Sequence, residues 1–408
     1  MKRYVFFTLK RFIPFFVITA AIFFVISTTM FVNVPVQYEY YVDEGMVRGD
    51  YGFDGASIII IVMAVLLFGF TSISPIIANS YRYSLRSADF YNQIGKGHKN
   101  VRLVNNLILL IAVIVSFTFA YIFGATILGI KNVIVFNKGT ITESAWDTTT
   151  YVKEPFMYHY AYFVPIYFML LIGGLVNYFI SYFLVTRANN AFNSVVMLVL
   201  GQVIIALGLM TPIWYLGIMT DGAIEIRYLA GAKTSSMISL VAITEYLFSG
   251  LLKGDSFNLE AFELVKVEDY IGLVIVVISL AIFFAFGAYS LFKFFKEEET
   301  TGELAGKPQG RGKIQDIIFH TGAAILGFWY LVLSASLDGL GLIDIVGIFS
   351  FIPSVVVYGA LYYVFYGLLR RNFRLKKKDL ALLLPIFIAN VLFGVARIVV
   401  TNAFYVEY

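Results

Sequence analysis

The chain has 408 residues, of which 60% are hydrophobic and only 14% charged, and its formal net charge is +4. Because a soluble domain carries about 25% charged residues, this composition excludes an ordinary soluble protein and indicates an integral membrane protein. The sequence contains no cysteine, which excludes disulfides, thiolate metal sites and thiol catalysis.

The apolar segments are long enough to cross a bilayer as helices. A spanning helix needs about 20 apolar residues, and only helices or closed barrels satisfy their backbone groups in lipid. Residues 58–70 are almost continuously apolar and lack the alternation of barrel strands, so we expect an all-α, polytopic membrane protein. Ten apolar stretches can be marked, at about 12–35, 56–79, 104–130, 157–186, 193–218, 236–252, 269–293, 315–336, 345–369 and 380–404.

The N-terminus begins with four cations within its first eleven residues, namely Lys2, Arg3, Lys10 and Arg11. Cytoplasmic segments are enriched in Lys and Arg, so we expect the N-terminus inside. The apolar run continues to about residue 30, beyond the 7–15 residues of a signal-peptide core, and we expect it to remain as the first span. The next loop, 37–55, is mainly acidic, as an outer loop can be.

A polar island at 80–106 separates the second and third spans. It carries five cations, namely Arg82, Arg86, Lys96, Lys99 and Arg102. Apolar residues spaced by three or four positions predict a short amphipathic helix, with a second face on which Arg86 and Asp89 are close enough to interact. We interpret the island as a cytoplasmic loop that contacts another protein; the alternative is a basic loop neutralised by lipid headgroups.

Few polar residues lie within the spans. Asn177 and Gln202 occupy adjacent spans, and we interpret them as a candidate lining of a transport pathway; the alternative is hydrogen bonding between helices. Asn390 and Arg397 are the other two, and Arg397 is expected to snorkel or to pair near the outer face.

The stretch 236–252 decides the topology. If it crossed the membrane, the run RRNFRLKKK at 370–378, with six cations, would lie outside, against the positive-inside bias. The stretch is short and has Glu245 in its middle, and a central charge costs about 2.5–3.5 kcal/mol on insertion scales. We therefore expect a re-entrant hairpin, nine spans in all, and the C-terminus outside.

These spans divide into a six-span unit at 1–296 and a three-span unit at 314–408, joined by a charged cytoplasmic linker at 297–313. The linker contains Gly302, Gly306 and Lys307, but the glycine spacing is too short for a Walker A motif and Pro308 stands at the hydroxyl position. The three histidines (His98, His159 and His320) are far apart in sequence. We expect no metal site, no nucleotide site and no enzymatic activity in the chain itself.

Two motifs resemble those of ABC-2-type exporter permeases. SLRSADFY at 84–91 is similar to the cytoplasmic motif of the bacterial Ytr-like branch, named after an acetoin-utilisation operon. KEEETTGELAGKP at 296–308 resembles the charged stretch after the sixth span in that branch. The sequence departs from the branch at 92–100, where NQIGKGHKN replaces a Ser-Leu-Pro stretch followed by a basic residue.

The resemblance implies a six-helix transmembrane domain with an N-terminal interfacial helix at 1–12 and re-entrant helices between spans five and six, where 236–252 lies. The three C-terminal spans are additional to that unit. The resemblance also implies an ATPase-coupling helix, formed by Ser84, Leu85, Arg86, Ser87, Ala88, Asp89, Phe90 and Tyr91.

The resulting hypothesis is the permease subunit of an ATP-driven exporter in a bacterial plasma membrane, with a cytoplasmic N-terminus. Its partners would be separate ATPase subunits that bind the ATP and Mg, a second permease copy or sister permease, and membrane lipid, but no nucleic acid. The cargo would be amphipathic, such as an antimicrobial peptide or a lipid-like molecule. The alternatives are a secondary transporter or channel, a non-transporting sensor or anchor subunit, and a membrane-embedded enzyme.

Overall fold

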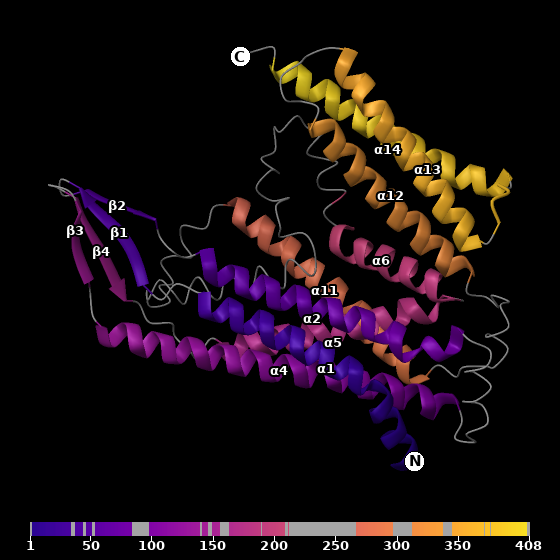
Figure 1. Cartoon of the computed structure of the whole chain (residues 1–408). Coiled ribbons are helices and arrows are strands. Elements are labelled where there is room, and N and C mark those ends of the chain that lie inside the picture. Colours follow the sequence, from indigo (N-terminus) through magenta and orange to yellow (C-terminus); the bar gives the residue numbers. More distant parts are fainter. Residues whose placement is uncertain are drawn as a thin grey trace.

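A computed structural model describes residues 2–33, 37–43, 46–50, 54–83, 98–138, 141–145, 149–155, 163–188, 190–208, 211, 267–296, 312–337, 345–370, 372–375 and 377–405. Within these residues the chain forms long helices and one small sheet (Figure 1). The helices are α1 (Lys2–Asn33), α2 (Asp54–Ala78), α4 (His98–Lys138), α5 (Phe163–Thr186), α6 (Ala191–Leu207), α11 (Val267–Lys296), α12 (Gly312–Leu337), α13 (Ile345–Arg370) and α14 (Lys377–Tyr405), with a short 3₁₀ helix, η1 (Ser80–Tyr83), after α2.

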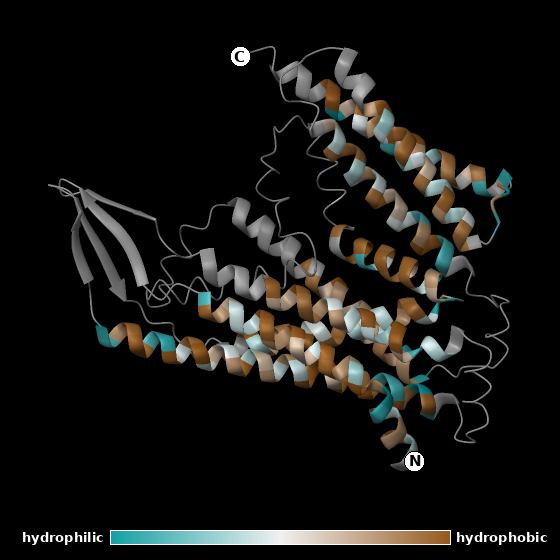
Figure 2. Cartoon of the chain, in the orientation of Figure 1, coloured by the Kyte–Doolittle hydropathy of each residue, from teal (hydrophilic) through white to brown (hydrophobic). Residues whose placement is uncertain are grey.

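The helices agree with a multi-pass membrane protein. Six of them are long and apolar enough to cross a bilayer, and α2 and α6 contribute shorter apolar segments. Brown, apolar residues run along the helices in Figure 2. Large apolar side chains on their outer faces are exposed, as at Phe119 (72%) and Val65 (64%), which suits a surface in contact with lipid.

Nine of the ten apolar stretches correspond to helices in the described part of the chain. The tenth, 236–252 with Glu245, lies outside the described residues, as do the island segment 84–97 and the linker segment 297–311. Helix α1 is continuous from Lys2 to Asn33, so the structure describes no break between the implied interfacial helix and the first span.

Contacts between helices fix their directions. Tyr4 of α1 contacts Asn105 of α4, and Arg102 contacts Phe294 near the end of α11. Gln315 at the start of α12 bonds to the carbonyl of Arg187, just after α5. One end of the bundle therefore holds the starts of α1, α4, α6, α12 and α14 and the ends of α2, α5, α11 and α13; we call it the basal end.

These directions bear on the connection between α6 and α11. Because α6 begins at the basal end and α11 finishes there, the connection leaves and re-enters the bundle at the opposite end. The end of α6 and the start of α11 therefore lie at the same end of the bundle. The re-entrant hairpin at 236–252 lies outside the described residues and remains a prediction.

A four-stranded antiparallel sheet stands at the opposite end, and we did not predict it from the sequence. Its order is β2-β1-β4-β3, built from β1 (Gln37–Asp43), β2 (Met46–Asp50), β3 (Ile141–Ala145) and β4 (Thr149–Pro155). The central pair joins β1 to β4, with Tyr40 opposite Val152. Two loops distant in sequence thus form one structure beyond the ends of α1 and α4 (Figure 1).

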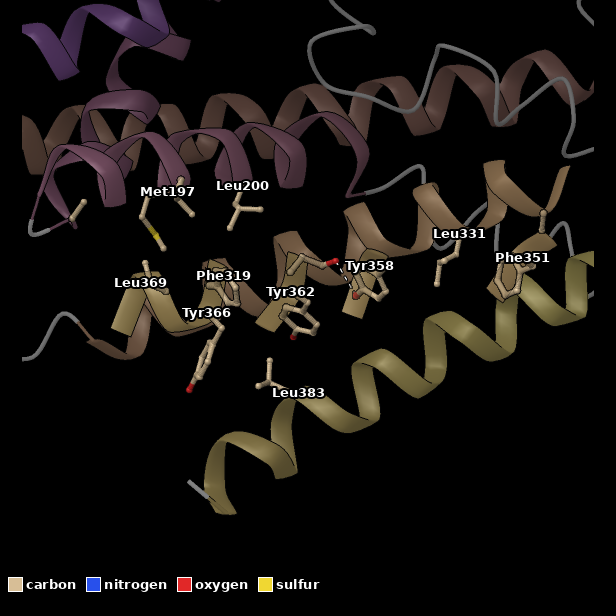
Figure 3. Packing of buried hydrophobic residues seen from close by; sticks show 14 of the residues in the cluster. Met197, Leu200, Phe319, Leu331, Phe351, Tyr358, Tyr362, Tyr366, Leu369 and Leu383 are labelled. Carbon is tan, nitrogen blue, oxygen red and sulfur yellow. Dashed lines mark hydrogen bonds between the residues drawn. The ribbon is translucent and has the colours of Figure 1, made fainter. Parts of the chain in front are cut away.

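Two large hydrophobic clusters hold the helices together. The first lies among α1, α2, α4 and α5 and includes Phe23, Leu67, Phe117 and Leu170. The second lies among α6, α12, α13 and α14 and is rich in tyrosine. The close-up in Figure 3 shows Met197 and Leu200 of α6 facing the C-terminal helices, so α6 joins the last three helices to the rest.

Candidate functional site

One group of buried polar residues lies in the first turns of α4, at the C-terminal end of the island. Arg102, Asn105 and Asn106 are each 0% exposed; we call them the α4 polar cluster. They occupy positions i, i+3 and i+4, which lie together on one helix face. From the sequence we expect Arg102 in a basic cytoplasmic loop. That expectation is wrong, because helix α4 already begins at His98 and turns Arg102 into the bundle.

Arg102 joins α4 to α11. Its Nη2 donates a 2.8 Å hydrogen bond to the carbonyl oxygen of Phe294, one of the last-turn carbonyls that have no partner within a helix. The guanidinium also lies 6.0 Å from the Phe294 ring and 5.9 Å from the Tyr182 ring. A cation at a helix C-terminus is favourable because of the helix dipole, so Arg102 stabilises the basal end of α11.

The two asparagines join α4 to three further helices. Asn105 Oδ1 accepts a 2.9 Å hydrogen bond from the Tyr4 hydroxyl of α1. Asn106 Oδ1 accepts one of 2.9 Å from the Tyr178 hydroxyl of α5, and its amide lies 3.4–3.5 Å from that of Asn79, directly after α2. One helix turn therefore contacts the basal ends of four other helices.

The chemistry of this cluster is structural rather than catalytic. Among the described residues, Arg102 Nε and Nη1 and Asn105 Nδ2 have no hydrogen-bond partner. Leaving buried donors unpaired costs about 1–3 kcal/mol each, more when charged. The cluster contains no nucleophile or general base of ordinary reactivity, and its bonds to several helices suit the positioning of those helices.

A second polar group joins α2, α5 and α6 deeper in the bundle, and it contains both predicted pathway residues. Gln202 Nε2 donates to Asn177 Oδ1 at 2.8 Å, so the two side chains meet directly. Asn177 Nδ2 in turn lies 2.9–3.0 Å from Ser72, Thr71 and the Phe68 carbonyl. Asn177 is fully buried. These are the helix-to-helix hydrogen bonds of the alternative interpretation; a role in lining a pathway remains a prediction.

A third polar group runs through the C-terminal helices. His320 Nδ1 lies 3.0 Å from the Tyr362 hydroxyl, and Tyr366 donates to Asp379 Oδ1 at 2.5 Å. Asn390 bonds to the Tyr358 hydroxyl at 2.9 Å and to the Ala324 carbonyl at 3.0 Å. Three tyrosines spaced by four residues follow one face of α13, as Figure 3 shows for Tyr358, Tyr362 and Tyr366.

The other predicted residues are dispersed. Arg397 is half-buried near the end of α14. His98 begins α4 and His320 lies in α12, while His159 lies outside the described residues. In the described part of the chain no group of three His, Asp or Glu is placed to hold a metal ion. The eight residues of the implied coupling helix, 84–91, are outside the described residues.

A shallow apolar groove of about 920 Å³ lies between α4 and α5, toward the sheet. Its lining includes Ala125, Gly129 and Phe168. The polar atoms of Thr118 and Tyr167 within it are bonded to each other at 2.7 Å. The groove is therefore a surface for hydrocarbon and offers little to a polar ligand.

A scan against protein-family models found no match to this chain, and searches of curated proteins and of solved structures found none either. Function is therefore inferred from the residues and from the geometry above.

Proposed function

We propose that the chain is the membrane subunit of an ATP-driven exporter of ABC-2 type, working with separately encoded ATPase subunits. The observation that carries the proposal is the segment 84–91 between α2 and α4, whose sequence resembles the ATPase-coupling motif of that family. Both flanking elements, α2 and α4, have their adjoining ends at the basal end of the bundle. A partner that pressed on this segment would act next to the α4 polar cluster.

The distribution of cations supports a cytoplasmic basal end. The basic N-terminus, the island and the run at 370–378 all adjoin helix ends on this side. Cytoplasmic loops carry the excess of Lys and Arg, and an ATPase partner requires that side. In the proposal, closure of the ATPases on ATP and Mg moves the coupling segment, and the helices switch between inward-open and outward-open arrangements.

The cargo in this proposal is amphipathic, such as an antimicrobial peptide or a lipid-like molecule. The groove between α4 and α5 supports an apolar contact surface, because its lining is almost entirely hydrocarbon, with Ile122, Ile130 and Val133 along α4. A second permease, either another copy or a sister chain, would complete the transport unit, and the protein would lie in a bacterial plasma membrane.

The test is co-purification of the tagged chain from its native membranes, followed by mass spectrometry and an ATP-hydrolysis assay. We expect an ATPase to accompany the chain, and we expect a triple substitution of Asp89, Phe90 and Tyr91 by alanine to release it. A matched control neutralises Arg370, Arg374 and Lys377 at the same end of the bundle and should retain the ATPase. Transport by the chain alone, driven by an ion gradient, would refute the proposal.

A second candidate, a proton-coupled secondary transporter, is favoured by the polar group in the C-terminal helices. His320 with Tyr362, and Tyr366 with Asp379, place exchangeable protons within spanning helices, as proton-relaying transporters do. The chain alone in liposomes with a pH-sensitive dye distinguishes the two. Proton uptake coupled to cargo, abolished by His320→Gln, would favour this candidate over the exporter.

A further inference from the structure

The α4 polar cluster follows the segment 84–97 of the island without an intervening element. The segment outside the described residues ends at residue 97, α4 begins at His98, and Arg102 lies one turn later. Any displacement of the segment 84–97 is therefore applied directly to the first turns of α4. These turns are also where α4 bonds to other helices, since Arg102, Asn105 and Asn106 between them reach four helices.

The connections to α11 and to α1 use different residues, so these two can be separated from each other and from the pair that depends on Asn106. The bond to α11 depends on Arg102 Nη2, and the bond to α1 depends on Asn105 Oδ1. The connections to α5 and α2 depend on Asn106. Except for the long contact with Asn79, each is 2.8–2.9 Å. Helices in a bilayer lack a strong hydrophobic force holding them together, so such bonds decide which helix ends move together.

Unpaired donors in the cluster argue against a purely stabilising role. A buried guanidinium with two of its three nitrogens unpartnered in the described residues is costly compared with an apolar side chain of similar volume. Asn105 Nδ2 is likewise unpartnered there. A cluster selected for stability alone would be better served by leucine or methionine. Polar groups whose partners can be exchanged suit a part of the bundle that changes arrangement.

We propose that Arg102, Asn105 and Asn106 are positioning residues that make the basal ends of α1, α2, α5 and α11 follow the start of α4. The mechanical connection stands on these contacts alone. Its use in coupling ATP hydrolysis to transport rests on the proposed function, in which the ATPase moves the segment 84–91. The α4 polar cluster then distributes one local displacement to four helices at once.

Distances between spin labels test the connection helix by helix. The chain contains no cysteine, so introduced cysteines are its only thiols. Leu107→Cys on α4 pairs with Phe295→Cys on α11 or with Leu9→Cys on α1; all three positions are exposed, at 37, 52 and 47%. Pulsed electron paramagnetic resonance of the full chain in lipid nanodiscs then measures each pair separately.

In nanodiscs without a partner, we expect Arg102→Met to broaden the 107–295 distance distribution and leave the 107–9 distribution unchanged. Tyr4→Phe removes only the hydroxyl bonded to Asn105, and it should broaden 107–9 and leave 107–295 unchanged. Tyr167→Phe is the matched control, because its hydroxyl bonds to Thr118 in the middle of α4, away from the cluster, and it should change neither. If neither Arg102→Met nor Tyr4→Phe changed its distance distribution, the inference would be overturned whether or not an ATPase exists.

The complex with the co-purified ATPase tests the coupling role. With ATP, Mg and vanadate, we expect both label pairs to shift, and we expect each variant to lose only the shift of its own pair while retaining bound ATPase. Retention of both shifts in both variants would overturn the coupling role. Failure of any ATPase to co-purify would instead refute the proposed function, and the nanodisc distances would then decide the mechanical connection by themselves.

Discussion

The basal ends of α1, α2, α4, α5 and α11 and the interior of α12, α13 and α14 differ in the balance of their contacts. At the basal end, single hydrogen bonds from amides, hydroxyls and one guanidinium link α4 to its neighbours. In α12, α13 and α14, hydrogen bonds such as that between Tyr358 and Asn390 are combined with stacked and tilted rings; the Tyr358 ring centroid lies 5.7 Å from that of Tyr362 and 5.8 Å from that of Phe387. Hydrogen bonds exchange partners at low cost, whereas interlocked rings leave little room to move. We therefore expect motion in the first group and a fixed arrangement in the second.

The largest expected effect is in the aromatic stack. Tyr358 is 6% exposed, and its hydroxyl bonds to Asn390. Tyr358→Ala should lower the free energy of unfolding by about 3–5 kcal/mol, the range for removing a large buried aromatic side chain. Thermal unfolding in detergent measures it, with the exposed Leu361→Ala on the same helix as control. Equal losses from both variants would contradict a fixed aromatic core.

A smaller loss is expected where α1 and α4 approach most closely. A Cβ on Gly124 would lie 2.2 Å from Phe31 Cδ2 and 2.7 Å from Ser27 Oγ. Gly124→Ala should therefore lower the free energy of unfolding by about 1–3 kcal/mol, as overpacking does. A Cβ on Gly69 would have nothing within 4 Å, so Gly69→Ala is the control and should stabilise slightly through helix propensity. If Gly124→Ala left the free energy of unfolding unchanged, the interface between α1 and α4 would also rearrange easily.

The hydrogen bond between Asn177 and Gln202 should contribute less. A double-mutant cycle with Asn177→Ala and Gln202→Ala isolates the bond between them. We expect a coupling energy of about 0.6 kcal/mol and at most about 1.7 kcal/mol, the range for hydrogen bonds between membrane helices. Reversible unfolding in mixed micelles provides the four free energies. A coupling well above that range would place this pair with the rigid contacts rather than the exchangeable ones.

The smallest change in stability is expected for Arg102→Met. Loss of the bond to Phe294 is offset by removal of a buried charge that is incompletely paired, so the unfolding temperature should stay close to that of the parent chain. Arg102→Ala leaves a cavity and should unfold earlier. Comparing the unfolding temperatures of the two variants distinguishes the effect of lost side-chain volume from the effect of the removed charge. A strong destabilisation by methionine would mean that Arg102 serves stability first.

Much of the helical layout could be predicted because long apolar runs determine it directly. The α4 polar cluster was missed for a specific reason: Arg102 lies among cations of the island, and a charge count treats them alike. Its spacing to Asn105 and Asn106, three and four residues on and just before an apolar run, was the available signal for one buried helix face. The partner atoms, such as the Phe294 carbonyl 192 residues away, have no local signature.

The sheet was missed because its central pair is non-local. β1 and β4 are rich in Tyr, Val and Thr, which favour strands, but each is short and lies in a loop between spans. Pairing of Tyr40 with Val152 depends on α1 and α4 ending side by side, which only the packed bundle provides.

The length of α4 has a consequence for both faces of the membrane. Its 41 residues make a rod of about 60 Å at about 1.5 Å per residue, roughly twice the hydrocarbon thickness of about 30 Å. A tilt of about 5° about one tip displaces the other by about 5 Å over that length. In the proposed orientation, the sheet at the far tip would move whenever the cytoplasmic end tilts. A fluorescent antibody fragment bound to the sheet would then detect, from outside the cell, a tilt of α4 at its cytoplasmic end.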